Sequence, residues 1–358
     1  MIRSIVQQRL ANQRITQPKQ RDPAKLVAWL GAVQAQEFAP AKWGLGLRLP
    51  AGATDAKIQR AFDTGRILRT HVLRPTWHFV TPADIGWLLE LTGQSVHRRM
   101  AVYDRQLGLD APIFRRAAKV CERVLRDNNF LIRKELGKHF AEVGLPDTGW
   151  ALGHIALYLE AEAVICSGPR RGNQSTYALL GERAPRGRRL KRDEALGELA
   201  RRYFRSHGPA TLRDFVWWSG LNTSDAKRGL DMIAARTLEV DGKSYWTVGS
   251  VRTRGRHTVH LLPIYDEYIV AYRDRDVVPQ GPARVPSRTT GYVQFQHALV
   301  IDGQVAGTWR ASPKRKGVEL RVAPLRALTA AETRAVRRQA AQYQRFAGTA
   351  VSLTGLEP

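Results

Sequence analysis

The first strong pattern along the chain is a helix that leads to a pair of glutamines. Apolar residues recur from Pro23 onward at the i, i+3, i+4 and i+7 spacing of one buried helix face. We expect Pro40 to stop this helix and residues 34–39 to unwind, because proline moves the residue before it out of the α region. In an extended segment residues two apart lie on one side, so Gln34 and Gln36 can aim their carboxamides at a single point. The apolar face consists of Leu26, Trp29, Leu30 and Val33.

The next residues predict a hairpin after three helices. Two short β-prone runs flank Arg74 and Pro75, and the turn between them can bring residues 69–81 back beside the glutamines. Three helices followed by a hairpin is the plan of a winged helix-turn-helix unit. The expected helices are 4–14, 23–33 and 54–65, the expected connector is 42–49, and the expected strands are 67–73 and 76–80.

The same order of elements recurs twice more, at a period of roughly 70 to 90 residues. Repetition of a whole order is better evidence than any single copy. We therefore expect three tandem winged helix-turn-helix units, in residues 1–107, 108–187 and 188–250. The helices of the second and third copies are expected at 114–126, 132–143, 149–162, 193–207, 212–219 and 223–235, and their strands at 163–167, 175–180, 238–240 and 245–248.

From residue 251 the pattern changes to strands, which predicts a separate domain at 251–358. We expect a small β-rich domain, a partly closed barrel, with a terminal helix at 330–346 packed on it. The fold class is therefore α+β. The expected strands are 257–262, 268–272, 292–301, 304–310 and 318–322.

The net charge indicates a chain that binds nucleic acid. Its 358 residues carry 57 Lys and Arg against 32 Asp and Glu, a formal net charge of +25. A field of this size attracts polyanions, and nucleic acid is the commonest such partner. The loop 277–290 is our prediction for the segment that enters the minor groove. The arginines expected on phosphates are Arg69, Arg74, Arg170, Arg171, Arg188, Arg189, Arg284 and Arg288, and a solvated side chain is the alternative for each.

Composition also argues against several classes of protein. Two cysteines are too few for a disulfide framework, and no spacing of histidines and cysteines is typical of a metal site. No apolar signal segment opens the chain, and no run approaches the length of a membrane span. We therefore expect a cytoplasmic protein without a metal or another cofactor, without an obligate protein partner, and monomeric.

Three strings of residues resemble the AlkZ-like winged-helix DNA glycosylases, a family that includes crosslink-unhooking enzymes of antibiotic self-resistance and YcaQ-type repair enzymes. The strings are VQAQE at 33–37, RPTWHFV at 74–80 and VIDGQVAGTWR at 300–310. The resemblance runs over essentially the whole chain in motif order. It implies winged helices wrapped around DNA, with Gln34 and Gln36 as the catalytic pair. YcaQ-type members have Asp at the position of Gln36, so this chain looks closer to the resistance branch. Pro75 stands where many relatives have glycine.

Two glutamines restrict the chemistry. Release of an undamaged purine requires protonation of the leaving group, and glutamine is neither a useful acid nor a base. Guanine alkylated at N7 already carries a positive charge and departs as a neutral base. The enzyme then has to position a water and stabilise charge, which fixed carboxamide dipoles can do. The expected substrates are therefore cationic N7-alkylguanines, or N3-alkylpurines, in double-stranded DNA.

Other polar residues near the motifs have less specific roles. His71 and His78 are expected to contact phosphates or to stabilise the abasic sugar, and a structural histidine is the alternative for each. Thr76 is a further expected DNA contact. Lys42 follows the motif and is a candidate for Schiff-base chemistry, which would make the enzyme a lyase; an exposed lysine is the alternative.

Two other functions fit the same sequence. A DNA-binding regulator would use the glutamines only to touch phosphate. A binder of structured RNA is a third reading. The glycosylase remains our main prediction, with bulky adducts or interstrand crosslinks as its substrates.

Overall fold

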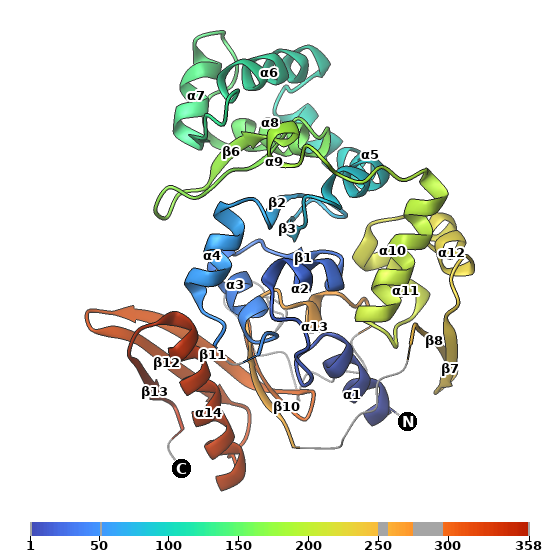
Figure 1. Ribbon diagram of the computed structural model, residues 1–358, viewed down its shortest axis with the longest axis vertical. Coiled ribbons are helices and arrows are strands. Elements are labelled where there is room, and N and C mark those ends of the chain that lie inside the picture. Colours follow the sequence, from blue (N-terminus) through green and yellow to red (C-terminus); the bar gives the residue numbers. More distant parts are fainter. Residues whose placement is uncertain (1, 51, 250–256, 275–295, 357–358) are drawn as a thin grey trace.

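The structure, a computed structural model, describes residues 2–50, 52–249, 257–274 and 296–356 (Figure 1). Its helices and strands form a mixed α and β fold, as expected. After α1 (Ile2–Asn12) the chain builds a first unit around a three-stranded sheet of order β1-β3-β2. The unit comprises α2 (Pro23–Leu30), β1 (Val33–Gln34), α3 (Phe38–Gly46), α4 (Asp55–Asp63), β2 (Leu68–His71) and β3 (Trp77–Val80).

The first unit corrects two predictions about the glutamine segment. The helix ends at Leu30, three residues before the expected end at Val33, because Gly31 adopts a positive φ of 86° and its N–H closes the last turn. Pro40 lies in the first turn of α3, where its missing N–H costs nothing, so the expected connector at 42–49 is largely helical. The extended backbone expected at Gln34 is confirmed, since this residue lies in β1.

Two further units repeat the order helix, strand, helix, helix, strand, strand. In the second the sheet order is β4-β6-β5, and in the third Ala210 bridges to β8 in place of a full first strand. In all three the first strand pairs with the last. The second unit comprises α6 (Ala111–Val124), β4 (Leu131–Ile132), α7 (Arg133–Ala141), α8 (Gly149–Ala161), β5 (Ile165–Ser167) and β6 (Thr176–Leu179). The short α9 (Leu180–Arg183) leads to the third: α10 (Arg192–Ser206), α11 (Leu212–Ser219), α12 (Thr223–Asp231), β7 (Arg236–Val240) and β8 (Lys243–Thr247).

A helix of 22 residues that the sequence analysis did not predict, α5 (Ile85–Gln106), joins the first two units. Trp87, Leu88 and Leu91 on its first half are buried in the core it shares with the third unit. The helix α8 packs against both α5 and β2, so most of its surface is covered. It is therefore not free to lie in a DNA groove as the third helix of an isolated winged helix would be.

The C-terminal part is a five-stranded sheet of order β13-β12-β11-β10-β9, with α14 packed on it. Its described strands end in two free edges, so they do not close into the expected barrel. The strand expected at 268–272 is wrong: Asp266 accepts a hydrogen bond from the amide of Tyr268 and caps a short helix instead. The elements are β9 (Val259–Leu262), α13 (Glu267–Val270), β10 (His297–Ile301), β11 (Gln304–Lys314), β12 (Gly317–Pro324), α14 (Ala330–Ala347) and β13 (Val351–Thr354).

The apolar cores join parts of the chain that are far apart in sequence. One core packs Leu26 and Trp43 of the first unit against Leu299 and Trp309 of the C-terminal sheet. A second core joins the first unit to the third, whereas the second unit has a core of its own. The helix α13 consequently lies beside β1 and α2 near the centre of the molecule (Figure 1). The boundaries at 107, 187 and 250 stay predictions.

Candidate functional site

Gln34 is held in place by its strand neighbour and by two residues from other parts of the chain. It pairs with His78 across β1 and β3, so the hairpin does fold back beside the glutamines as predicted. Its backbone amide donates to Oε1 of Glu267 at 2.6 Å, and its Oε1 accepts from Nη2 of Arg74 at 2.8 Å. The residue is 8% exposed. Backbone and side chain are therefore fixed before any substrate arrives.

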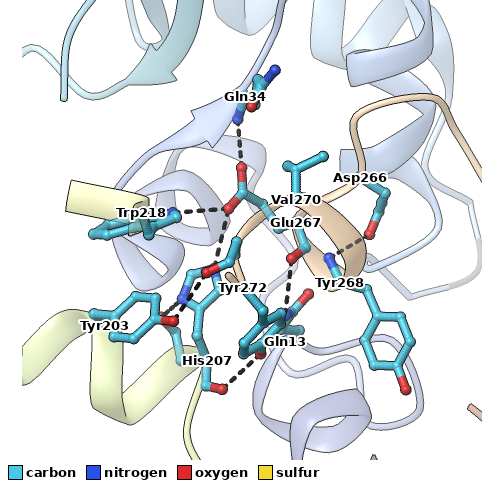
Figure 2. A network of polar contacts seen from close by, with 12 residues as sticks. Gln13, Gln34, Tyr203, His207, Trp218, Asp266, Glu267, Tyr268, Val270 and Tyr272 are labelled. Carbon is cyan, nitrogen blue, oxygen red and sulfur yellow. Dashed lines mark hydrogen bonds and ion pairs between the residues drawn. The ribbon is translucent and has the colours of Figure 1, made fainter. Parts of the chain in front are cut away.

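Glu267 is the centre of the network behind Gln34 (Figure 2). Besides the Gln34 amide, it accepts from Nε1 of Trp218 at 2.9 Å, and Nε2 of His207 lies 3.3 Å from the same Oε2. Burial alone would raise the pKa of this carboxyl, but the His207 contact, the charge of Arg74 and the Gln34 amide outweigh it and lower the pKa to about 2. Glu267 is therefore a buried anion at neutral pH.

His78 supports Arg74 and has no exposed surface of its own. Its Nδ1 lies 2.8 Å from the carbonyl of Thr76, an acceptor, and its Nε2 lies 3.4 Å from Nη2 of Arg74, a donor. These partners require the proton on Nδ1 and the lone pair on Nε2. Burial and the nearby guanidinium lower the pKa of His78 to about 3, so the ring is neutral. A direct DNA contact by His78 stays a prediction, and its burial indicates a supporting role.

Gln36 is half-buried at the other end of the motif, beside Arg69 and Trp77. Its Oε1 accepts from the backbone amide of Trp77 at 3.2 Å. Arg69 donates to the carbonyls of Ala35 at 2.9 Å and Gln36 at 3.2 Å, and its guanidinium lies 4.2 Å from the centre of the Trp77 ring. Burial lowers the pKa of Arg69 to about 10, so it stays charged at neutral pH. Arg69 thus holds the backbone of the motif.

The orientation of both carboxamides follows from their partners. Arg74 and the Trp77 amide only donate hydrogen bonds, so the atom that faces each must be the carboxamide oxygen. Each oxygen keeps one lone pair, and each NH₂ group points away from these partners. The glutamines are therefore preorganised dipoles, each with one acceptor position and two donors left for a substrate or water.

His71 lies in β2 and is tied to the second unit. Its Nδ1 is 2.5 Å from Oε2 of Glu160, which also accepts from the His71 amide at 2.9 Å. The ring lies against Trp77, with 4.4 Å between ring centres. This burial and pairing favour the structural alternative for His71, and its expected contact with DNA stays a prediction.

A cleft of about 540 Å³ opens next to Gln34. Of the predicted residues it brings together Gln34, Arg74 and Thr76, whereas Gln36 is not among the residues that line it. Four lining residues are arginines, and none of the described lining residues is acidic. We call it the Gln34 cleft; its lining is Gln34, Arg74, Pro75, Thr76, Arg99, Arg213, Val216, Trp217, Thr223, Tyr265, Val270 and Arg273.

Sequence reasoning missed Arg99, Arg213, Trp217, Tyr265 and Arg273. They come from α5, from α11 and from the segments on either side of α13, and no motif links them. One signal was the adjacent pair Trp217 and Trp218 in one short expected helix, because neighbouring helical residues point in different directions and do not share one buried face. The four guanidinium groups make the cleft a site that attracts anionic groups such as phosphate.

Other predicted residues lie away from the cleft. Arg170 and Arg171 are in the turn between β5 and β6, where Arg171 pairs with Glu135 at 2.5 Å. Arg188 and Arg189 are exposed in the segment before α10, and Arg188 lies 3.5 Å from Glu198. Arg284, Arg288 and the rest of the loop 277–290 lie outside the described residues.

Lys42 is paired within the first unit. Its Nζ lies 2.7 Å from Oδ2 of Asp55 and 2.9 Å from Oε1 of Gln59, and only 7% of the residue is exposed. An ammonium held by a carboxylate in this way is a poor nucleophile. The geometry gives the Schiff-base alternative no support.

The described part of the chain lacks two kinds of feature. It contains no group of three or more His, Cys, Asp or Glu placed to hold a metal ion. Across the same residues, no helix combines the length and apolar composition needed to cross a bilayer.

Comparison with known proteins identifies the family of the whole chain. The sequence model of the AlkZ-like DNA glycosylases matches residues 27–346. The chain belongs to this family. A curated relative from Streptomyces sahachiroi, "Interstrand DNA cross-link repair glycosylase", is 27% identical over 93% of this chain and 92% of its own. A solved structure, "Streptomyces sahachiroi DNA glycosylase AlkZ", has a TM-score of 0.80 at 23% identity and covers 98% of this chain and 99% of its own.

Membership of this family decides between the three functions considered from the sequence. An AlkZ-like chain is a DNA glycosylase, so the enzyme prediction is confirmed over the regulator and the RNA binder, and DNA is its partner. The strings quoted from the sequence fall on strands of the fold. VQAQE contains β1, RPTWHFV contains β3, and VIDGQVAGTWR runs from the end of β10 into β11.

Proposed function

We propose that this enzyme hydrolyses the N-glycosidic bond of cationic N7-alkylguanine in double-stranded DNA, with bulky adducts and interstrand crosslinks as its substrates. The observation that carries the proposal is Gln34, a neutral carboxamide held by Arg74 at the buried floor of a basic cleft. The relative named as a crosslink repair glycosylase supports the substrate class.

The chemistry requires little from the protein because the substrate is already activated. The bond between C1′ and N9 breaks, and its electron pair neutralises the positive charge of the alkylated purine. Water then bonds to the oxocarbenium-like sugar at C1′ and loses a proton to solvent, leaving an abasic site. Gln34 and Gln36 hold this water through their remaining lone pairs, and no carboxylate acts as a base.

The fold supports a mode of DNA binding in which the duplex lies against several units at once. The three repeats have the order of winged helix-turn-helix units, and we assign them to a clamp around one duplex. Since α8 is covered, the contacts of the second unit come from its hairpin turn, where Arg170 and Arg171 lie. Arginine contacts of this kind make binding depend strongly on salt.

The test is release of alkylated bases from duplex DNA. One duplex carries a single N7-methylguanine and another a nitrogen mustard crosslink; after incubation, alkali cleaves the strand at any abasic site. We expect cleavage with the wild-type enzyme and a loss of at least about 100-fold for the double variant Gln34→Ala, Gln36→Ala. Normal release by the double variant would overturn the mechanism. Release of neither lesion by the wild type would overturn the substrate class.

A covalent trap separates hydrolysis from lyase chemistry. Borohydride reduces a Schiff base between enzyme and sugar to a stable crosslink. We expect no protein–DNA product on a denaturing gel from the wild type. A product that disappears in Lys42→Gln would show the lyase alternative.

A further inference from the structure

The Gln34 cleft is divided into a buried floor and an exposed rim. Gln34, Arg74 and Val270 at the floor are each less than a tenth exposed. Its volume of about 540 Å³ is within the range of sites that hold drug-sized ligands. A methyl group on guanine would leave such a space nearly empty. The rim consists of Arg99, Arg213, Trp217, Thr223 and Arg273, all at least partly exposed.

Trp217 presents a stacking surface in this cleft. Its indole N–H donates to the carbonyl of Val270 at 2.9 Å, so the polar edge of the ring is already satisfied and the ring is held in place. The residue is nevertheless 38% exposed. The guanidinium carbons of Arg273 and Arg74 lie 5.4 and 6.0 Å from its ring centre. A pinned, exposed indole beside guanidinium groups suits a planar ligand.

A second aromatic residue of the cleft, Tyr265, has a strained backbone. Tyr265 lines the cleft with a φ of 59°, a left-handed conformation that is unfavourable for an aromatic residue. The next residue, Asp266, is fixed by two hydrogen bonds from Arg48, at 2.6 and 2.7 Å. The fold therefore stabilises a strained aromatic residue that helps to form the cleft.

The hydrogen-bonding groups of the cleft do not match an extruded guanine. The Watson–Crick edge of guanine carries one acceptor, O6, and two donor groups, N1–H and N2–H₂, which need acceptors. Among its described residues the cleft offers four guanidinium groups and no carboxylate, and one of the two lone pairs of the Gln34 oxygen already accepts from Arg74, so acceptors for these two donor groups are few. A guanine crosslinked to the opposite strand also cannot leave the duplex alone. Donors in a wide cleft instead suit carbonyl and ether oxygens of an attached organic group.

We propose that the Gln34 cleft binds the part of the lesion that is not DNA: a planar, drug-sized aromatic group with oxygen acceptors, attached to N7 of guanine. Trp217 is the residue that selects it, by stacking. This assignment rests on the proposed glycosylase function, because it places the attached group beside Gln34 while the guanine stays near the duplex.

The experiment compares a small lesion and a large one. The substrates are duplexes with a single N7-methylguanine or with the N7-guanine adduct of aflatoxin B1, a planar polycyclic alkylator that carries carbonyl and ether oxygens. For Trp217→Ala we expect kcat/KM on the aflatoxin adduct to fall about 10-fold or more, the range measured when an aromatic side chain that stacks on a base is removed. Release of N7-methylguanine should change less than about 3-fold. Trp217→Phe keeps an aromatic ring and should retain most of the activity on the large adduct.

Affinity measured without turnover makes the result independent of catalysis. The wild type should bind the aflatoxin duplex more tightly than the undamaged duplex, and Trp217→Ala should lose this preference. The matched control is Trp150→Ala, because Trp150 is 76% exposed and outside the cleft, and its replacement should leave the preference unchanged.

The possible outcomes separate the two proposals. Equal slowing of both lesions by Trp217→Ala, or no effect on either, would overturn the role of Trp217. A lost binding preference would support the site for the attached group even if the wild type released neither lesion. That last result would contradict only the proposed chemistry.

Discussion

The first and second units have the same order of elements and the same strand pairing, yet only the first carries the candidate site. Gln34 in β1 and Ile132 in β4 occupy the same place, the end of the first strand and opposite the last. The amide of Ile132 donates to Glu135, three residues further along the chain, at 2.9 Å. The amide of Gln34 donates to Glu267, which lies 233 residues away.

This difference shows how one fold unit acquires chemistry. In the second unit the strand end is closed by its own helix, so the unit is complete by itself. In the first unit the equivalent position is closed by a buried carboxylate from α13. The site therefore exists only where the C-terminal part and the third unit pack against the first.

The largest expected effect is on stability at this junction. Glu267→Gln keeps the shape of the side chain but removes its negative charge. In the wild type this charge is stabilised by the Trp218 hydrogen bond, the His207 contact and the positive charge of Arg74. We expect a loss of about 3 kcal/mol in the free energy of unfolding, since breaking a buried charge pair on one side is costly. Urea unfolding measures it. Glu135→Gln, the matched change in the second unit, should cost less because Glu135 is only part-buried; equal losses would contradict the comparison.

A smaller effect is expected on catalysis when the hairpin arginine is changed. Arg74→Lys keeps a positive charge but cannot reach Gln34 and the carbonyls of Trp217 and Trp218 together. The Gln34 carboxamide would then lose its fixed direction, and we expect single-turnover base release to slow by on the order of 100-fold. Arg171→Lys in the second hairpin is the control and should leave the rate unchanged. Similar rates for both variants would show that Arg74 does not orient Gln34.

The buried imidazole of the first hairpin predicts a pH dependence of stability. An unfolded histidine titrates near pH 6.5, whereas burial holds the pKa of His78 at about 3. Between these values the unfolded chain binds more protons, so stability falls as the pH is lowered. From pH 7 to pH 5 we expect a loss of about 2 kcal/mol from this residue. Glu267 adds little in this window, because its pKa is about 2 in the folded protein and 4.5 in the unfolded chain, so both states are mostly ionised above pH 5.

Urea unfolding at pH 7 and pH 5 measures the effect of His78. His78→Asn removes the titrating group and should flatten the dependence by about the same amount. An unchanged pH dependence in this variant would show that folding does not lower the pKa of His78.

The smallest expected effect concerns the exposed turn of the second unit. Arg170→Ala with Arg171→Ala should lower the slope of log affinity for DNA against log salt by about 1 for each phosphate that the variant no longer neutralises. Base release at saturating DNA should not change, because neither residue lines the Gln34 cleft. An unchanged slope would remove this turn from the DNA interface.

Local patterns predicted most of the repeated elements. Thr54, Thr211 and Asn222 cap helices that begin within one residue of the expected starts at 54, 212 and 223, and Asp241 and Gly242 form the turn between the strands expected at 238–240 and 245–248. The long α5 was missed because it packs against two different neighbours, α8 and α10, so its apolar residues do not form one continuous face. The helix α13 was taken for a strand because only its cap at Asp266 distinguishes the two, and that cap is held by Arg48 from the first unit.

The site was predictable only where its residues are close in sequence. Gln34 and the hairpin of Arg74 and His78 form two short strings, and their pairing follows from the turn between β2 and β3. Glu267 and Trp217 come from elements whose positions depend on packing of the C-terminal part. Nothing local in their sequence indicates that they lie beside Gln34.

The most direct test of this account is to replace Gln34 by the residue at the equivalent position of the second unit. For Gln34→Ile, DNA affinity and single-turnover release of N7-methylguanine are measured on the same duplex, with unfolding in urea as the check on folding. We expect affinity to stay within about 3-fold while release slows by about 100-fold or more. Release at the wild-type rate by a folded Gln34→Ile enzyme would contradict the claim that this carboxamide carries the chemistry.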